Sequence, residues 1–176
     1  AGDIEVANNT MKRIRVCGND GYNAGNAGFR GIQIKGSTIA DINNNTFGGT
    51  YLADFGTNPQ NADAIQSDGG AGYPYSGYIY GILALDNVNL TADYNTFNIL
   101  LQNGYYGGWL ECITHYSSGK AIITNNDNAQ YHQETFGTYG YMWSNAIRLQ
   151  PTASSVGHIV SNNKIRTIAI NGAETS

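Results

Sequence analysis

The chain has little charge, little proline and little cysteine. Only 12% of its 176 residues are charged, against about a quarter in ordinary globular proteins. It has three prolines and two cysteines, but 23 glycines and 13 tyrosines. Because 41% of the residues are apolar, the chain can bury a core and is not predicted to be disordered. This composition, rich also in Asn and Thr, favours an extracellular protein or one on the surface of a virion or other particle.

Several functions are disfavoured by what is missing. The formal net charge is −4 and there is no basic run, so nucleic acid is not expected as a partner. No apolar run approaches the roughly 18 residues of a membrane span, and no signal peptide pattern is seen. No zinc constellation, phosphate loop or G-x-S-x-G is present. No metal or other cofactor is therefore expected, with calcium at GNDGYN (18–23) kept as an alternative.

The two cysteines are not predicted to pair. Cys112 is in phase with Leu110 and is expected to pack inward as a small hydrophobe. Cys17 follows a short strand at 14–16 and is expected to face outward. Different turns of the chain and opposite faces argue against a disulfide, although the sequence leaves their oxidation state open.

Asparagine-rich corners recur along the chain with apolar residues on both sides. Asparagine is unfavourable inside helices and ordinary strands, so its repetition needs another explanation. The copies are VANNTM (6–11), INNNTF (42–47), ADYNTF (92–97), ITNNDN (123–128) and VSNNKI (160–165). Their spacing is uneven, which indicates a degenerate repeat with inserts of variable length.

One asparagine in each copy occupies the same position. Stacked corners can exchange amide hydrogen bonds along the stack, and asparagine also tolerates the left-handed backbone of a sharp corner. The residue two positions later is large and apolar in every copy except one, where it is Asn128. The predicted column consists of Asn9, Asn45, Asn95, Asn126 and Asn163. The alternative is that these segments are merely solvated turns.

Short strands with period-two apolar residues accompany the corners. The strands expected before a corner are GIQI (31–34), AIQS (64–67), WLEC (109–112) and AIRL (146–149). The strands expected after a corner are IRV (14–16), YLADF (51–55), ILL (99–101) and IAI (168–170). This alternation predicts an outward polar strip of Gln33, Gln66, Glu111 and Arg148. The repeat predicts an all-β fold, a parallel β-helix of about four to five coils, as a single domain over residues 1–176.

Long inserts are predicted to project from one corner of this helix. They span 17–31, 54–80, 102–108 and 135–144. Aromatic rings stack on the C–H faces of sugars, and amides bind hydroxyl groups. Packing of the rings onto the helix and a protein–protein interface remain alternatives. Together with Gln33, Gln66 and Arg148, the expected substrate-binding residues are Tyr73, Tyr75, Tyr78, Tyr105, Tyr106, Trp109 and Trp143.

Catalysis is the second hypothesis for the same face. Glycoside hydrolysis needs two carboxylates about 5–10 Å apart. The acids near the strip are Asp63, Asp68 and Glu111, and His115 is the candidate base for a lyase or epimerase.

The NNTF corners together with ADAIQ (62–66) resemble the right-handed parallel β-helix repeat proteins over nearly the whole chain. That superfamily includes pectin-active enzymes, alginate epimerases and lyases, and the spikes with which phages engage cell-surface polysaccharide. The resemblance implies a right-handed helix and a polysaccharide partner. Residues 61–63 resemble the N-T-D motif of polygalacturonases, but the paired aspartates, the G-H-G and the R-I-K are absent, as is the D-P-H-E of alginate epimerases.

The leading hypothesis is therefore a spike or adhesin module that binds cell-surface or extracellular polysaccharide. A polysaccharide hydrolase, lyase or epimerase is the alternative, and a purely structural fibre element is a further one. Neither end of the sequence shows a cap, so we expect a segment of a longer chain, or ends covered by partners such as the other chains of a homotrimer or flanking domains of a particle protein.

Overall fold

The computed structural model describes residues 2–17, 27–49, 65–68, 77–98, 100–104, 107–135, 141–152 and 157–171. Within these ranges the chain forms fifteen β-strands and no helix. Every pair of neighbouring strands is parallel. The all-β prediction is confirmed.

The strands follow one another in five similar passes of three strands each. The first is β1 (Asp3–Ala7), β2 (Thr10–Met11) and β3 (Ile14–Cys17), and the second is β4 (Ala27–Asn43), β5 (Thr46–Phe47) and β6 (Ile65–Asp68). The third is β7 (Gly77–Asp93), β8 (Thr96–Phe97) and β9 (Leu100–Gly104), and the fourth is β10 (Gly107–Ser117), β11 (Ala121–Thr124) and β12 (Asp127–Thr135). The fifth is β13 (Tyr141–Leu149), β14 (Ile159–Ser161) and β15 (Lys164–Asn171).

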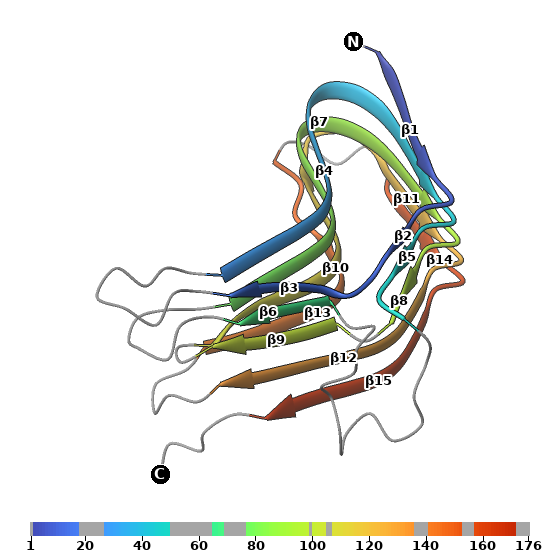
Figure 1. Ribbon diagram of the computed structural model, residues 1–176. Helices are drawn as coiled ribbons and strands as arrows, with labels where there is room; N and C mark the ends of the chain where they lie inside the picture. The colour runs from blue at the N-terminus through green and yellow to red at the C-terminus, as the bar shows by residue number, and fades with distance from the viewer. Residues whose placement is uncertain are drawn as a thin grey trace.

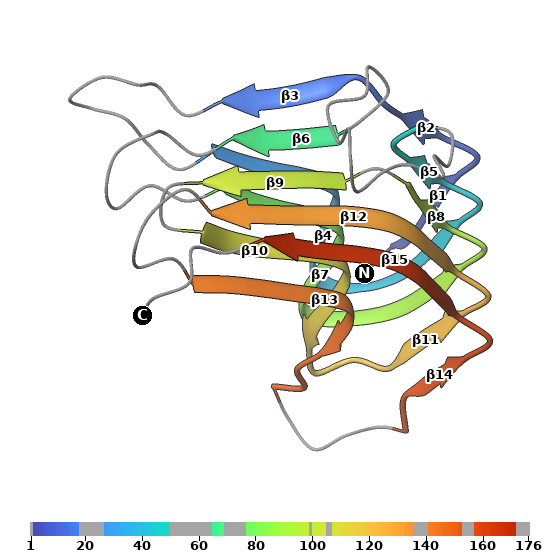
Figure 2. The same ribbon diagram turned by 90° about the horizontal axis from the view of Figure 1, so that it is seen from below.

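Each pass lies against the next, so that equivalent strands form two parallel sheets. One sheet follows the order β1-β4-β7-β10-β13, with β11 placed between β7 and β14. The other contains the short strands β2, β5 and β8 and the row β3-β6-β9-β12-β15. Figure 1 looks along the stack, and Figure 2 shows the row from β3 to β15 side by side.

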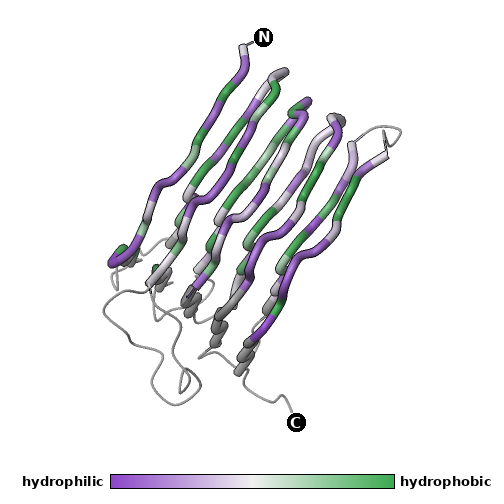
Figure 3. The backbone as a smooth tube through the Cα atoms, turned by 90° about the vertical axis from the view of Figure 1, so that its right-hand side faces the viewer, coloured by the Kyte–Doolittle hydropathy of each residue, from purple (hydrophilic) through white to green (hydrophobic). Residues whose placement is uncertain are grey.

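The core lies between the two sheets. In β7 the apolar residues Ile79, Ile82 and Leu90 are fully or almost fully buried, and Phe97 in β8 closes the same interior. Figure 3 shows hydrophobic and hydrophilic residues alternating along the adjacent backbones, as expected for strands with one face in the core. Each such side chain contributes about 1.5–3 kcal/mol when fully buried.

The predicted asparagine ladder is present. Its members are Asn9, Asn45, Asn95, Asn126 and Asn163, and the backbone N–H and the Nδ2 of each of the first four donate to Oδ1 of the next over 2.9–3.1 Å. From the second onward, each Nδ2 also donates to a backbone carbonyl of the preceding pass over 2.7–2.9 Å. The ladder therefore satisfies buried polar atoms that neither sheet pairs.

The left-handed backbone at each corner belongs to the residue just before the ladder asparagine. These residues are Asn8, Asn44, Tyr94, Asn125 and Asn162, with φ between 53° and 60°. Four of the five are asparagine, which tolerates this conformation better than most residues. Two different requirements therefore explain the paired asparagines of the repeat.

The large apolar residue after each ladder position also stacks in register. Met11 pairs with Phe47, Phe47 with Phe97, Phe97 with Asn128, and Asn128 with Ile165. The two phenyl rings lie 4.7 Å apart and are nearly parallel. Asn128, the exception in the sequence, is fully buried within this column, and neither atom of its amide has a hydrogen-bond partner in the part of the chain that the structure describes.

The predicted alignment of the GIQI-type strands is wrong in two of four cases. GIQI and AIRL do occupy equivalent positions, but AIQS belongs to β6 in the other sheet, where Ile65 pairs with Ile14 and Leu100. WLEC is displaced by three residues, because Ile113 rather than Leu110 pairs with Ile147. The proposed single strip of Gln33, Gln66, Glu111 and Arg148 therefore does not exist.

The second insert is also divided. Its predicted span, 54–80, contains the expected strand AIQS, and in the structure β6 and the start of β7 lie within it. Residues 50–64 connect β5 to β6, whereas 69–76 connect β6 to β7. Residues 69–76 connect the third strand of one pass to the first strand of the next, as residues 18–26, 105–106 and 136–140 do, whereas residues 50–64 connect a second strand to a third. The inserts therefore do not all leave from one corner. The YLADF strand expected at 51–55 lies outside the described residues.

Candidate functional site

A bend in the first sheet creates the most distinctive outer surface of the described residues. Figure 1 shows β4, β7 and β10 changing direction part-way along their length. At the bend, an added Cβ at Gly31 would lie 2.5 Å from Cε1 of Phe47, and one at Gly81 would lie 2.4 Å from Cε1 of Phe97. Only glycine fits where the stacked rings approach the backbone so closely, so these two positions fix the inner side of the bend.

Aromatic residues form a column on the outer face before the bend. Tyr78 pairs with Trp109, and Trp109 pairs with Trp143. The two indole rings lie 5.3 Å apart at 57°, and Trp143 is 53% exposed. We call Tyr78, Trp109 and Trp143 the aromatic column. All three were predicted as binding residues, and the strand pairing brings them together.

Two further columns flank the bend. The polar column, two residues after the aromatic column, consists of Arg30, Tyr80, Glu111 and Asn145. The bend column, on the other side, consists of Gln33, Leu83, Thr114 and Arg148. Members of both columns, with Leu85, Tyr116 and Gln150, line a groove of about 450 Å³. This volume is within the range of small-ligand sites.

Glu111 holds the two columns together. Its carboxylate is completely buried and accepts hydrogen bonds from Nη1 of Arg148 at 2.7 Å and from Nδ2 of Asn145 at 3.2 Å. The hydroxyl of Thr114 donates to its other oxygen. A buried carboxylate with a cation and two further donors is fully compensated. Its observed contacts make Glu111 an anchor for Arg148.

Tyr80 and Arg30 form the other end of the groove. Burial, with a smaller contribution from the charge of Glu111, raises the pKa of Tyr80. Its phenol therefore stays neutral and able to donate a hydrogen bond at physiological pH. The guanidinium of Arg30 lies 5.5 Å from the centre of the Tyr78 ring, in a cation–π arrangement.

His115 is not brought together with Glu111 on this face. It is fully buried in register with Ala84 and Leu149, and its Nε2 lies 2.9 Å from the carbonyl oxygen of Val88. Its ring meets that of His158 edge-on at 5.5 Å. Burial lowers the pKa of His115, and the nearby His158 lowers it further, whereas the hydrogen bond to Val88 raises it.

Several predicted site residues cannot be placed on the groove. Gln66 and Asp68 belong to β6 in the other sheet, and only the backbone of these two residues is described. Asp63, Tyr73, Tyr75, Tyr105 and Tyr106 lie outside the described residues. Cys17 has a described backbone only, while Cys112 is buried and free, as expected for a small hydrophobe. Burial raises the pKa of its thiol well above the usual range.

The sequence did not single out Leu83, Thr114, Tyr116 or Gln150 as site residues. The strand segment that the sequence pattern did not identify is GILA (81–84), which pairs with GIQI on one side and with CITH (112–115) on the other. Its fully apolar residues do not show the outward polar position that was used to identify the other strands.

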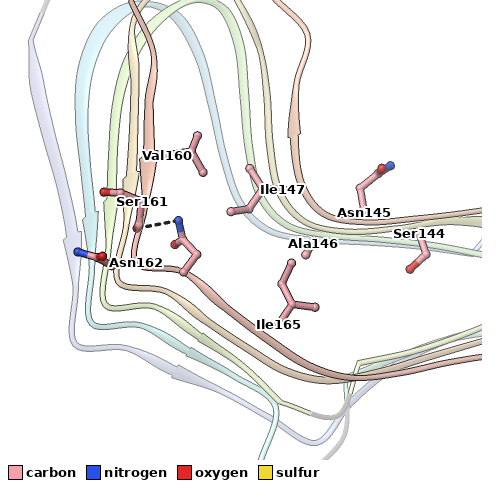
Figure 4. A pocket seen from close by; sticks show the side chains of 9 residues that line it. Ser144, Asn145, Ala146, Ile147, Val160, Ser161, Asn162 and Ile165 are labelled. Carbon is pink, nitrogen blue, oxygen red and sulfur yellow. Dashed lines mark hydrogen bonds between the residues drawn. The ribbon is translucent and has the colours of Figure 1, made fainter.

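A second hollow lies at the end of the stack. It has a volume of about 510 Å³ and is lined by residues of β13, β14 and β15 and the corner between the last two. Figure 4 shows Ile147, Val160 and Ile165 directed toward one another, whereas Asn145 points to the opposite side of its strand from Ser144. These apolar side chains continue the columns of the core, so the hollow is the end of the interior, with Ser and Asn residues of β13, β14 and the corner in its lining.

Comparisons of the chain with protein-family models, with curated proteins and with solved structures gave no match. Within the described ranges, no group of three or more His, Cys, Asp or Glu side chains is arranged to hold a metal ion. A search of the same ranges found no helix with the length and apolar character needed to cross a membrane.

Proposed function

We propose that the stacked passes form a right-handed parallel β-helix. The support is the repetition of three strand positions in five passes, the parallel pairing of each pass with the next, and the continuous asparagine ladder. These features are expected of a coil whose neighbours bury one another's faces. The handedness follows the resemblance of the NNTF corners and the general preference of parallel crossovers.

We further propose that this domain is a spike or adhesin module that binds cell-surface or extracellular polysaccharide. The observation that carries the proposal is the aromatic column beside a groove lined by polar side chains, both running along the stack. Trp143, the most exposed member of the column, offers a flat apolar face to the C–H groups of a sugar ring.

The groove supplies the complementary polar contacts. Gln33 is exposed in the bend column, and Gln150 lines the groove beside Arg148. Amide and hydroxyl groups at such positions bind sugar hydroxyls, which present donors and acceptors in alternation. Because the columns repeat along the stack, the surface suits an extended chain of sugars. This use is consistent with an extracellular or virion-surface location and with further chains or domains as partners.

The contacts of Glu111 do not favour catalysis. It is the only acidic residue in the three columns, and both of its oxygens already accept hydrogen bonds. Hydrolysis by two carboxylates would need a second acid about 5–10 Å away. Asp63 and Asp68 stay predictions for that role.

The test is retention of purified protein on immobilised bacterial surface and wall polysaccharides, followed by Trp143→Ala. Removal of an exposed stacking residue from a binding site costs about 2 kcal/mol or more, so retention should weaken at least about tenfold. The matched control is Tyr94→Asn, because Tyr94 is 59% exposed at a distant corner where the other four passes have asparagine. Failure of the wild-type protein to bind any polymer, or equal binding by both variants, would overturn the proposal.

A further inference from the structure

Among the described residues, the outer face formed by the polar column, the bend column and Lys35 carries more positive than negative charge. Its cations are Arg30 in the polar column, Arg148 in the bend column, and the exposed Lys35, two residues after Gln33. Glu111 is the only acid in the polar and bend columns. Some of these charged groups are already paired with other side chains and some are not. Only a group without such a partner can bind a charged ligand in the groove.

Arg148 is already committed to other residues. Its Nη1 donates to the buried carboxylate of Glu111 and its Nη2 donates to Oε1 of Gln150, both over 2.7 Å. Because Glu111 is completely buried and paired, its charge is largely cancelled toward the groove. Arg148 therefore serves to neutralise Glu111 and to hold the far wall of the groove.

Arg30 is held in place but its N–H groups are not occupied by the described residues. It is exposed, lines the groove, and has the Tyr78 ring at 5.5 Å as its contact. A cation–π contact leaves the guanidinium its N–H donors, and none of these donates to another described residue, so they are available to a ligand. Tyr80 lies beside Arg30 on the adjacent strand, and it lines the same groove.

The guanidinium fork matches a carboxylate. Two parallel N–H donors bind its two oxygens with a geometry that lysine cannot reproduce. Arg30 and Arg148 lie on strands three spacings apart, about 14 Å at ~4.8 Å per strand. The groove between them can therefore hold more than one sugar, with its anionic group at the Arg30 end.

We infer that Arg30 is a specificity-determining residue that binds a carboxylate of an acidic sugar, so that the groove selects carboxylate-bearing over neutral polysaccharide. This inference rests on the proposed polysaccharide-binding function. The anchored Arg148 end contacts the remainder of the chain through hydroxyl groups, and the aromatic column stacks on a neighbouring ring.

The experiment compares acidic polysaccharides with their own carboxyl-reduced forms, which keep the backbone and lose the charge. Hyaluronan, alginate and the acidic members of the bacterial panel serve as probes. The wild-type protein is expected to prefer the native polymer of at least one pair. Arg30→Gln should weaken binding to that native polymer by roughly tenfold to a hundredfold, the value of a charge-assisted hydrogen bond, and weaken binding to the reduced polymer by less than a few-fold.

Lys35→Gln is the matched control, because it removes one exposed positive charge near the groove without removing the guanidinium stacked on Tyr78. It should change the preference for native polymer by less than a few-fold. Equal losses in Arg30→Gln and Lys35→Gln would show a diffuse charge effect and overturn the inference.

The outcomes also separate this inference from the function on which it rests. If the protein binds neutral or carboxyl-reduced polymers as well as native ones, and Trp143→Ala abolishes that binding, polysaccharide binding stands and the role of Arg30 is refuted. A preference for sulfated over carboxylated polymer would also refute it. If the wild-type protein binds no polymer, both proposals fail.

Discussion

Two buried asparagines that lie two residues apart should respond in opposite ways to the same substitution. Asn126 and Asn128 are both completely buried. Oδ1 of Asn126 accepts hydrogen bonds from the N–H and the Nδ2 of Asn95 at 2.9 and 3.0 Å, and its Nδ2 donates to the carbonyl of Ala92 at 2.9 Å. Asn128 lies between Phe97 and Ile165 in its column, and its amide has no hydrogen-bond partner among the described residues.

Leucine has the same number and branching of side-chain heavy atoms as asparagine, so the substitution mainly replaces a polar amide by two somewhat bulkier methyl groups. Asn128→Leu removes a buried, unpartnered amide and should stabilise the protein by about 1–3 kcal/mol. Asn126→Leu leaves the N–H of Asn95 and the carbonyl of Ala92 without these partners inside the stack. At about 1–3 kcal/mol for each orphaned group, it should destabilise the protein by roughly 2–6 kcal/mol.

Urea unfolding followed by circular dichroism measures both effects. The midpoint should rise for Asn128→Leu and fall for Asn126→Leu, with little change in the slope of the transition. In a thermal melt, 1 kcal/mol corresponds to about 2–4 °C for a chain of this size. If Asn128→Leu lowers the midpoint as Asn126→Leu does, the amide of Asn128 has a stabilising role and the reasoning is refuted.

Two further predictions concern the interior. Gly81→Ala should destabilise the protein by about 3 kcal/mol, because the new methyl group would lie 2.4 Å from Phe97 and 2.5 Å from the carbonyl oxygen of Cys112. The control is Gly36→Ala, which meets only backbone strain at φ 102° and should cost less in the same urea titration. Equal losses of stability in the two variants would contradict the packing argument. Burial lowers the pKa of His115 below its unfolded value of about 6.5, so on acidification the unfolded chain takes up more protons than the folded chain. The stability that depends on a neutral His115 is therefore fully present above about pH 6.5 and decreases as the pH falls below it. Urea midpoints at about pH 7.5 and 5.0 should differ less in His115→Asn than in the wild-type protein, and an unchanged difference would exclude His115 as the cause.

The ladder could be predicted from the sequence because its requirements restrict residue choice at fixed spacing. A corner that needs both a left-handed residue and an amide with partners above and below admits few side chains. The column of large residues two positions later was predictable for the same reason, since each must fill the same interior. Even its exception, Asn128, was visible in the sequence, although its lack of partners was not.

The register of the strands was harder to predict, because a short period-two run looks the same in either sheet. Distance from the ladder asparagine distinguishes them. Ile14, Leu100, Tyr131 and Ile168 each follow a ladder asparagine by five residues, whereas their partner Ile65 follows Asn45 by twenty. The extra residues between β5 and β6 hid the equivalence and allowed AIQS to be assigned to the wrong sheet.

The groove could not be derived from alternation alone. The sequence assigned Tyr78, Trp109 and Trp143 to a wall of inserts, whereas the structure pairs them on neighbouring strands, and alternation could not bring the polar and bend columns together. These columns lie on either side of Gly31 and Gly81, where the phenyl rings of Phe47 and Phe97 pack closely against the backbone and leave room only for glycine. The packing of buried phenyl rings against the strand backbone therefore lies directly beneath the groove, and no local sequence pattern predicts this contact.

The direction of the asparagine ladder makes a whole pass the natural unit by which this protein can grow or shrink. Between passes, the inner ladder asparagines donate forward to the next Oδ1 and back to a carbonyl of the preceding pass, and their other hydrogen bond stays within the corner. Duplicating the segment between equivalent corners would present the same donors and acceptors to its neighbours. Since the outer columns run along the stack, each added pass would lengthen the binding surface by about 4.8 Å. The length of polymer that the surface spans can thus change in discrete steps without any redesign of the coil.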